Sequence, residues 1–387
     1  MSTRYGPMFI WGVTFIVFSV LVILLYKFLL KHSKKLEFHW GKAYLGSLYF
    51  SDLILLCLLV FIVGIRTNSG SDYYNYLLSF RNVDNWFHSL NQLLTTRFQN
   101  GLYVLMYVIK SFTKNEALFF VILAILNYLP IFYLIRKYSN DVLLSFSSWI
   151  FLGFFLMSTN ILKQSLAMVL VLLAFDCLIE KKYILFVILS FLSVWFHLST
   201  ILVIPIIYFS KYLRPSRNLY YSLSFIGMIF LVFFKEFLTF ITMILPIRYV
   251  KFYIVSFLQN NSNDIKLQLG AVVILILYLL LLYYLTDDKV LNQMNESYSQ
   301  MLVINLLTLP FLFISPGFYI FNRIAFIGLQ FSIFLVPFFN VNKKQILYSG
   351  LVISGFLITI LNADNNYYNY STIYNDIPVS IQEFVRR

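Results

Sequence analysis

Charged residues are scarce in this sequence. Only 12% of the 387 residues are Asp, Glu, Lys or Arg, whereas 60% are hydrophobic and the mean hydropathy is +0.80. A soluble globular domain carries about 25% charged residues, so this composition excludes that class. The sequence is that of a polytopic membrane protein, all-α and built as a helical bundle.

Cysteine and the common catalytic motifs are also nearly absent. Cys57 and Cys177 both lie inside apolar runs, which indicates neither a disulfide nor a metal cluster. The sequence has no GxGxxG or Walker A segment, no HExxH or CxxC, and no GxSxG. Asp72 has no acidic residue two positions away, so a metal-bound nucleotide-sugar site is not supported. We therefore expect no nucleotide donor, no metal and no other cofactor.

The charge that is present is mostly basic, with 29 Lys and Arg against 16 Asp and Glu and a net charge of +13. In a membrane protein this excess reflects loop lysines that follow the positive-inside rule, so we expect no nucleic-acid partner. The first apolar run, residues 8–30, is longer than a signal-peptide core and should remain as a span.

The apolar runs predict about twelve membrane spans in one integral domain, residues 1–387. They cover residues 8–30, 44–65, 116–135, 142–157, 161–179, 183–196, 198–210, 219–234, 267–285, 301–314, 318–339 and 346–361. Short basic turns between spans are typical of the cytoplasmic side. We therefore expect the long segments 66–115 and 235–266 and the tail 362–387 to be external, with both termini outside.

Two external stretches, residues 101–112 and 238–246, are apolar but too short to span, and we expect them to be interfacial or re-entrant. A third feature lies between Lys182 and Lys211, where an apolar run is interrupted at His197. This run predicts two short helices that meet at His197 near one face of the membrane. The basic residues at the two ends of the run would lie at the other face.

Four residues would lie near the outer ends of the predicted spans: Arg66, Lys163, His197 and Arg323. Taken singly, each has an ordinary alternative, namely a snorkelling cation or a structural histidine. Taken together, they are an excess of positive charge in a low-dielectric region, because Asp52 and Asp176 fall toward the cytoplasmic ends. A diphosphate is the anion that such a group would bind.

Tyrosine and asparagine accompany these cations and suit sugar rings and hydroxyls. The candidate sugar-binding residues are Tyr73, Tyr76, Gln164, Asn322, Arg248 and Tyr249. The segment 364–370 is also rich in Asn and Tyr, with a disordered polar end as the alternative.

Several short motifs resemble those of the Wzy-type polysaccharide polymerases, in their EpsG-like branch. They are Arg66 with Asp72-Tyr73 and Tyr76, Gln99-Asn100-Gly101-Leu102-Tyr103, Lys163-Gln164-Ser165-Leu166-Ala167, Trp195-Phe196-His197-Leu198-Ser199 and Asn322-Arg323. Two positions depart from the family pattern, which usually has Arg where Lys163 stands and often Glu where Gln99 stands. Lys163 keeps the positive charge of the usual Arg but lacks the guanidinium that binds an anion through two N–H groups at once. Gln99 lacks the carboxylate of the usual Glu, which removes a candidate acid or base.

The resemblance implies a GT-C-like glycosyltransferase of the bacterial inner membrane, with its active site facing the periplasm. It implies that the growing O-antigen or exopolysaccharide chain moves from undecaprenyl diphosphate onto a new undecaprenyl-diphosphate-linked repeat unit. In this scheme Arg66, Lys163 and Arg323 bind the diphosphate, His197 is the base, and Asp72 orients His197 or binds sugar. The expected partners are these lipid-linked oligosaccharides, the bilayer and a chain-length regulator.

Other functions use similar cations. A lipid-linked oligosaccharide flippase would bind the diphosphate without reaction, but no repeated half is visible in the sequence. An O-antigen-ligase-like enzyme or a polyprenyl-phosphate-sugar transferase shares the long outer loops. A purely structural scaffold is the least expected class, since it has no use for recessed cations.

Overall fold

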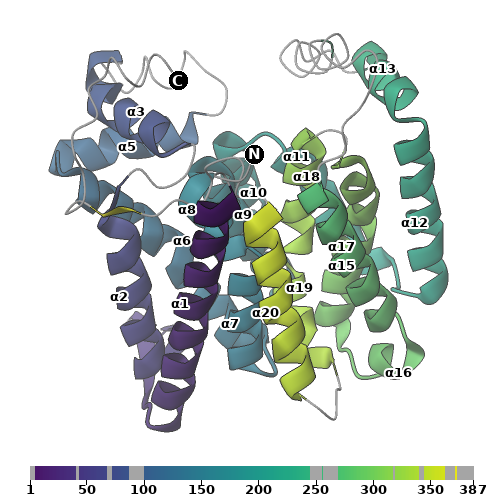
Figure 1. Cartoon of the computed structure of the whole chain (residues 1–387), viewed down its shortest axis with the longest axis horizontal. Helices are drawn as coiled ribbons and strands as arrows, with labels where there is room; N and C mark the ends of the chain where they lie inside the picture. Colours follow the sequence, from purple (N-terminus) through teal and green to yellow (C-terminus); the bar gives the residue numbers. More distant parts are fainter. Residues whose placement is uncertain are drawn as a thin grey trace. The chain divides into compact units, whose positions relative to one another are not determined.

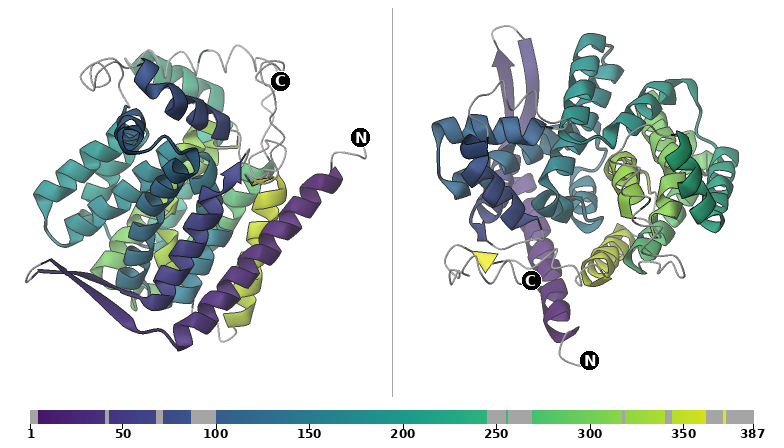
Figure 2. Two further views of the ribbon diagram at one scale, coloured as in Figure 1. Left: turned by 90° about the vertical axis from the view of Figure 1, so that its left-hand side faces the viewer. Right: turned by 90° about the horizontal axis from the view of Figure 1, so that it is seen from above.

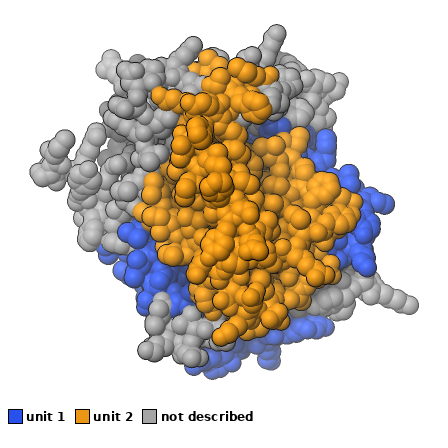
Figure 3. Space-filling model, turned by 90° about the vertical axis from the view of Figure 1, so that its right-hand side faces the viewer, with its two compact units in different colours: residues 1–198, 343–387 blue, residues 199–342 orange. Residues whose placement is uncertain are grey.

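The computed structural model describes residues 5–40, 43–67, 72–86, 100–244, 255, 269–316, 319–339, 344–361 and 371–372. The described chain is mostly helical. It divides into two compact units, shown in different colours in Figure 3. Unit 1 holds residues 1–198 and 343–387, and unit 2 holds residues 199–342.

Unit 1 is a bundle of apolar helices with two further helices across one end (Figure 1). The bundle helices are α1 (Tyr5–Lys31), α2 (Phe50–Gly64), α6 (Glu116–Tyr138), α7 (Val142–Phe151), α8 (Phe154–Asn160), α9 (Leu162–Ile179), α10 (Tyr183–Phe196) and α20 (Lys344–Leu361). The helices across the end are α3 (Tyr73–Trp86) and α5 (Gly101–Phe112). The bounds of α5 confirm a separate helix at 101–112, where the sequence predicts a short interfacial or re-entrant stretch.

Unit 2 is organised around one buried helix, α17 (Glu296–Ile314). The other elements are α11 (Thr200–Phe209), η1 (Ser210–Tyr212), α12 (Arg217–Val232), α13 (Phe234–Ile244), α15 (Leu269–Leu285), α16 (Asp288–Leu291), α18 (Tyr319–Leu329), α19 (Ser332–Leu335) and η2 (Val336–Phe338). In α17 the side chains from Met301 to Ile304 are all 0% exposed, so this helix forms the core of the unit.

Five of the described helical segments are long and apolar enough to cross a membrane, and counting each of two bent pairs as one span gives seven. Five more apolar helices have 10–17 residues, including α2, α10 and α11. The chain is therefore a multi-pass membrane protein. Every run that the sequence predicts as a span contains a helix, but several of these helices are shorter than a bilayer requires.

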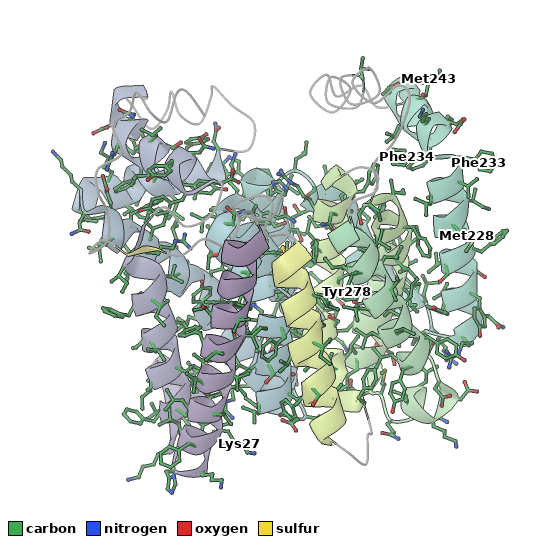
Figure 4. The ribbon with its side chains drawn as sticks, viewed as in Figure 1. Lys27, Met228, Phe233, Phe234, Met243 and Tyr278 are labelled. Atoms are coloured by element: carbon green, nitrogen blue, oxygen red, sulfur yellow. The ribbon has the colours of Figure 1, made fainter. Side chains whose placement is uncertain are left out.

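The two bent pairs break at identifiable residues. Gly153 has a left-handed backbone, with φ of 88°, and separates α7 from α8 at a 50° bend. The axes of α12 and α13 differ by 89°. Figure 4 shows Phe233 and Phe234 at this second bend, where Phe233 is 55% exposed and Phe234 is 4% exposed. The neighbouring Met228 and Met243 are exposed on α12 and α13, as expected of side chains that face lipid.

A β-hairpin corrects the expectation of an all-α fold and of a second span beginning at residue 44. Strands β1 (Lys35–Trp40) and β2 (Ala43–Tyr49) pair antiparallel. Figure 2 shows the hairpin at the end of unit 1 opposite α3 and α5. Residues 35–40 alternate polar and apolar, a strand pattern that the count of apolar runs missed. The span starts only at Phe50, because Asp52 accepts the Tyr49 backbone N–H at 2.7 Å and caps the helix.

The hairpin end of unit 1 holds two carboxylates of the bundle, Asp52 and Asp176, in ion pairs. Asp52 is 1% exposed and accepts two hydrogen bonds from Arg136, at 2.7 and 2.8 Å, and one from Tyr26 at 2.5 Å. Asp176 accepts from Tyr138 at 2.6 Å and lies 2.6 Å from Lys137. These pairs join α1, α2, α6 and α9 at one end, as the sequence predicts for Asp52 and Asp176.

Candidate functional site

Arg66 follows α2 directly and is enclosed. Its backbone lies in the two-residue strand β3 (Arg66–Thr67), and its side chain is 1% exposed. The guanidinium carbon is 5.0 Å from the ring centroid of Phe120 on α6, which also stacks on Tyr73 of α3 at 4.9 Å. Phe120 therefore places Arg66 and Tyr73 in one neighbourhood.

Asp72 sits at the start of α3 and is tied to the bundle. Its backbone N–H donates to the Oδ1 atom of Asn160 at 3.1 Å, and its carbonyl accepts from Tyr76 at 3.0 Å. Asn160 is 2% exposed and ends α8, immediately before the break that precedes α9. The segment that carries Asp72 is thus anchored to the beginning of the helix that carries Lys163.

Lys163 lies in the first turn of α9 and is half-buried. Its Nζ atom is 5.3 Å from the ring centroid of Tyr103 on α5, a cation–π distance. Gln164 is 2% exposed, and Ser165 accepts a hydrogen bond from Asn127 on α6. The start of α9 therefore has polar contacts on one side and an aromatic ring on the other.

His197 caps the end of α10, as the interrupted apolar run predicts. Its backbone N–H donates to Ser193 at 2.9 Å, and its side chain is half-buried. A Cβ atom on Gly101 would lie 2.7 Å from the Phe196 ring, so α5 begins in close contact with the residue before His197. The same helix, α5, thus approaches both Lys163 and the end of α10.

The contacts of α3, α5 and α6 gather Arg66, Asp72, Tyr73, Lys163 and His197 at one end of unit 1. Asp52 lies 14 residues before Arg66, at the other end of α2, and Asp176 lies 13 residues after Lys163 on α9. Each separation corresponds to about 20 Å along a helix. Arg66 and Lys163 therefore lie at the opposite end of this unit from Asp52 and Asp176, as the sequence predicts, whereas Asp72 lies at the same end as these two cations. Among the described residues, no group of three or more His, Cys, Asp or Glu could hold a metal ion.

Besides Asp72, two carboxylates at the site end, those of Glu116 and Asp84, pair with cations that are not candidate site residues. Arg81 on α3 donates two hydrogen bonds to Glu116, one of them at 2.9 Å, and these bonds raise the pKa of Arg81. Lys110 on α5 pairs with Asp84 at 2.5 Å. These two pairs fix α3 to α6 and α5 to α3.

The remaining predicted residues belong to unit 2 or lie outside the described residues. Asn322 is 7% exposed and Arg323 is half-buried, and both lie on α18 in unit 2. Their association with Lys163 and His197 stays a prediction. Arg248 and Tyr249, together with Gln99 and the segment 364–370, lie outside the described residues.

Phe120 and Asn127 contact candidate site residues, although the sequence motifs do not include them. Asn127 is a polar residue in an otherwise apolar run, and this was an available signal. Phe120 carries no such signal, because it is one of 42 phenylalanines and only its contacts with Arg66 and Tyr73 distinguish it.

Comparison with known proteins adds one finding. The family model described as the EpsG family matches residues 49–375, which include every candidate site residue. No curated protein and no solved structure matches the chain.

Proposed function

This chain belongs to the EpsG family, and from that membership we propose that it is a polysaccharide polymerase that works on lipid-linked glycans. In the proposed reaction, a growing O-antigen or exopolysaccharide chain moves from undecaprenyl diphosphate to a new undecaprenyl-diphosphate-linked repeat unit. The enzyme is a glycosyltransferase of the bacterial inner membrane. A chain-length regulator is a proposed partner.

The proposal includes a complete topology. We propose about twelve spans in a GT-C-like arrangement, with the short helices α2, α10 and α11 counted as crossings. Support comes from the agreement between each predicted span and a helix. The end of unit 1 with α3 and α5 would face the periplasm, and the end with the hairpin would face the cytoplasm.

The observation that carries the proposed function is the distribution of charge in unit 1. Lys163 and His197 are half-buried at the same end, Arg66 is enclosed nearby, and Asp52 and Asp176 pair at the other end. Basic side chains gathered at one end of the bundle create a positive potential that attracts an anionic ligand. A diphosphate bearing a lipid chain is such a ligand at a membrane surface.

The proposed step couples one proton transfer to one substitution. The His197 imidazole takes the proton of the acceptor hydroxyl, and the hydroxyl oxygen forms a bond to the anomeric carbon of the donor sugar. The bond between that carbon and the diphosphate oxygen breaks, and undecaprenyl diphosphate leaves with the bonding electrons. The proton then passes from His197 to water.

The cations have different proposed roles because they differ in exposure. Lys163 is half-buried and would touch the diphosphate, as would Arg323. Arg66 is enclosed, so its charge would act through the low-dielectric interior on the leaving group. Asp72 would orient His197 or bind sugar, and Tyr73, Tyr76, Gln164 and Asn322 are candidate sugar contacts.

A transporter is the second candidate, and one observation favours it. Discontinuous helices commonly form binding sites in transporters, and α8 and α9 break at Ile161, two residues before Lys163. A flippase would move the lipid-linked oligosaccharide across the bilayer without joining two of them. The product of the reaction therefore distinguishes the two functions.

The test uses the purified full chain in vesicles supplied with lipid-linked repeat units. We expect His197→Ala to lose nearly all long glycan, with normal membrane insertion. His32→Ala is the matched control, because His32 is exposed at the hairpin end of α1. Wild-type chain lengths from His197→Ala would remove this residue from the site. If the unmodified chain moved the substrate across the bilayer without chain growth, the flippase function would replace the polymerase function as the assignment.

A further inference from the structure

A short strand pair joins the candidate site to a distant part of the chain. Strand β3 pairs antiparallel with β4 (Ser371–Thr372), so that Arg66 lies opposite Thr372 and Thr67 lies opposite Ser371. Helix α20 ends at Leu361, and β4 belongs to the segment that follows it. The chain therefore returns from α20 to the end of α2.

The pairing involves Arg66, one of the three cations of the proposed diphosphate site. Helix α2 ends at Gly64, and the Ile65 N–H still donates to the Phe61 carbonyl at 3.0 Å. Arg66 comes after this last helical bond, so the helix no longer dictates its backbone. Successive side chains of a strand point to opposite faces, and the alignment of β3 with β4 therefore determines which way Arg66 points.

We propose that strand β4 is a positioning element of the diphosphate site, which holds the Arg66 backbone so that the enclosed guanidinium stays where its charge acts on the anion through the protein interior. This inference rests on the proposed function for the identity of the ligand, but not for the contact itself. Strand β4 would then be required for phosphate binding and not for the stability of the bundle.

The first test breaks the pairing with proline, which removes a backbone N–H and is poorly tolerated within paired strands. Thr372→Pro and Ser371→Pro are compared with Ser380→Pro, a proline placed further along the same segment. The probe is inorganic pyrophosphate as an inhibitor of polymerisation by the full chain in vesicles. We expect both β4 variants to need about tenfold more pyrophosphate, because the Arg66 charge is no longer held in its place near the anion, with the acceptor KM unchanged.

The second test separates positioning from a general structural effect. If β4 acts through Arg66, then Thr372→Pro should have no further effect on pyrophosphate inhibition in an Arg66→Met background. Additive losses would mean that β4 acts elsewhere and would overturn the proposal. A parallel change in the acceptor KM would do the same.

The third test does not depend on activity. Thr67→Cys with Ser371→Cys, in a background with Cys57 and Cys177 replaced by serine, should form a disulfide. Residues opposite each other in antiparallel strands have Cα atoms roughly 4.5 to 5.5 Å apart, within the range that a disulfide bridges. The control is Asn75→Cys with Ser371→Cys, since Asn75 is exposed on α3 at the same end of unit 1.

We expect the first pair to cross-link, the control not to, and the oxidised protein to polymerise as well as the same variant when reduced. Absence of the cross-link would overturn the pairing, and loss of activity on oxidation would overturn the proposal that the paired strands hold Arg66 in its working position. The proposed function fails differently, through the absence of chain growth by the unmodified protein.

Discussion

Lys163 shows at the scale of a single residue how the site combines charge with an aromatic ring. Its ammonium lies 5.3 Å from the Tyr103 ring centroid, and the side chain remains half-buried. Ammonium and guanidinium groups both bind phosphoryl oxygens, but only guanidinium does so as a fork. The charge at this position should therefore matter more than the shape of the group.

Two substitutions test this distinction. Lys163→Arg should retain most polymerisation, and Lys163→Met should lose about 10- to 100-fold, the effect of one charge-assisted hydrogen bond. Lys181→Met is the control, because Lys181 is exposed just beyond the far end of α9. The measurement is the initial rate of glycan extension in vesicles. Equal rates for Lys163→Met and the unmodified chain would show that Lys163 does not bind substrate and only extends its charge to the membrane surface.

At the scale of elements, α5 approaches α10 closely because its first residue, Gly101, has no side chain and lies against the Phe196 ring. Gly101 begins this helix, and any Cβ at that position would clash with the Phe196 ring. Small residues allow such close approach between membrane helices. The position of α5 should consequently determine the distance between Tyr103 and the end of α10.

Gly101→Leu should therefore reduce polymerisation strongly while the protein still inserts and remains monodisperse in detergent. Gly350→Leu on α20 is the matched control, since a Cβ there meets nothing within 4 Å. The readouts are extension rate and size-exclusion profile. A rate near that of the unmodified chain for Gly101→Leu would show that α5 can shift without consequence for the site.

Residues 35–49 show how much of an element could be predicted from its residues. The break at His197 and the helix at 101–112 follow from the lengths of apolar runs, which are local properties. The hairpin also has a local signal, the alternation in 35–40, but the neighbouring apolar residues obscured it. The direction of α3 and α5 across the bundle end has no local signal, because it depends on Phe120 and Glu116 of another helix.

For the whole molecule, the buried ion pair of Asp52 at the hairpin end of unit 1 joins three helices and is a candidate stabilising contact. Asp52 is buried and accepts hydrogen bonds from Arg136 on α6 and from Tyr26 on α1. Breaking a buried ion pair by removing one charge typically costs about 3 to 5 kcal/mol, whereas an exposed pair contributes less than about 1 kcal/mol.

Asp52→Asn should accordingly lower the unfolding free energy by about 3 kcal/mol or more. Glu37→Gln is the control, because its pair with Lys35 is about half exposed and should have little effect. Thermal unfolding in detergent, followed by tryptophan fluorescence, measures the difference. Equal unfolding temperatures for the two variants would contradict a stabilising role for the Asp52 pair.

The orientation of the whole chain has its own test. Single cysteines at Asn75 and Lys181, both exposed and at opposite ends of unit 1, are introduced into a chain without Cys57 and Cys177. An impermeant thiol reagent added to intact spheroplasts should label the cysteine at position 75 and not the cysteine at position 181. The reverse pattern would place the candidate site in the cytoplasm and exclude the proposed topology.

The sequence by itself determined the membrane class, the order of the helices and the types of residue in the site, because hydropathy, run length and charge act locally. Only the tertiary structure decided that Phe120 contacts both Arg66 and Tyr73, that Asn160 holds Asp72, and that Thr372 lies opposite Arg66. These contacts join residues that are far apart in the chain. Their free energy depends on packing of the folded helices, which no single stretch of the sequence specifies.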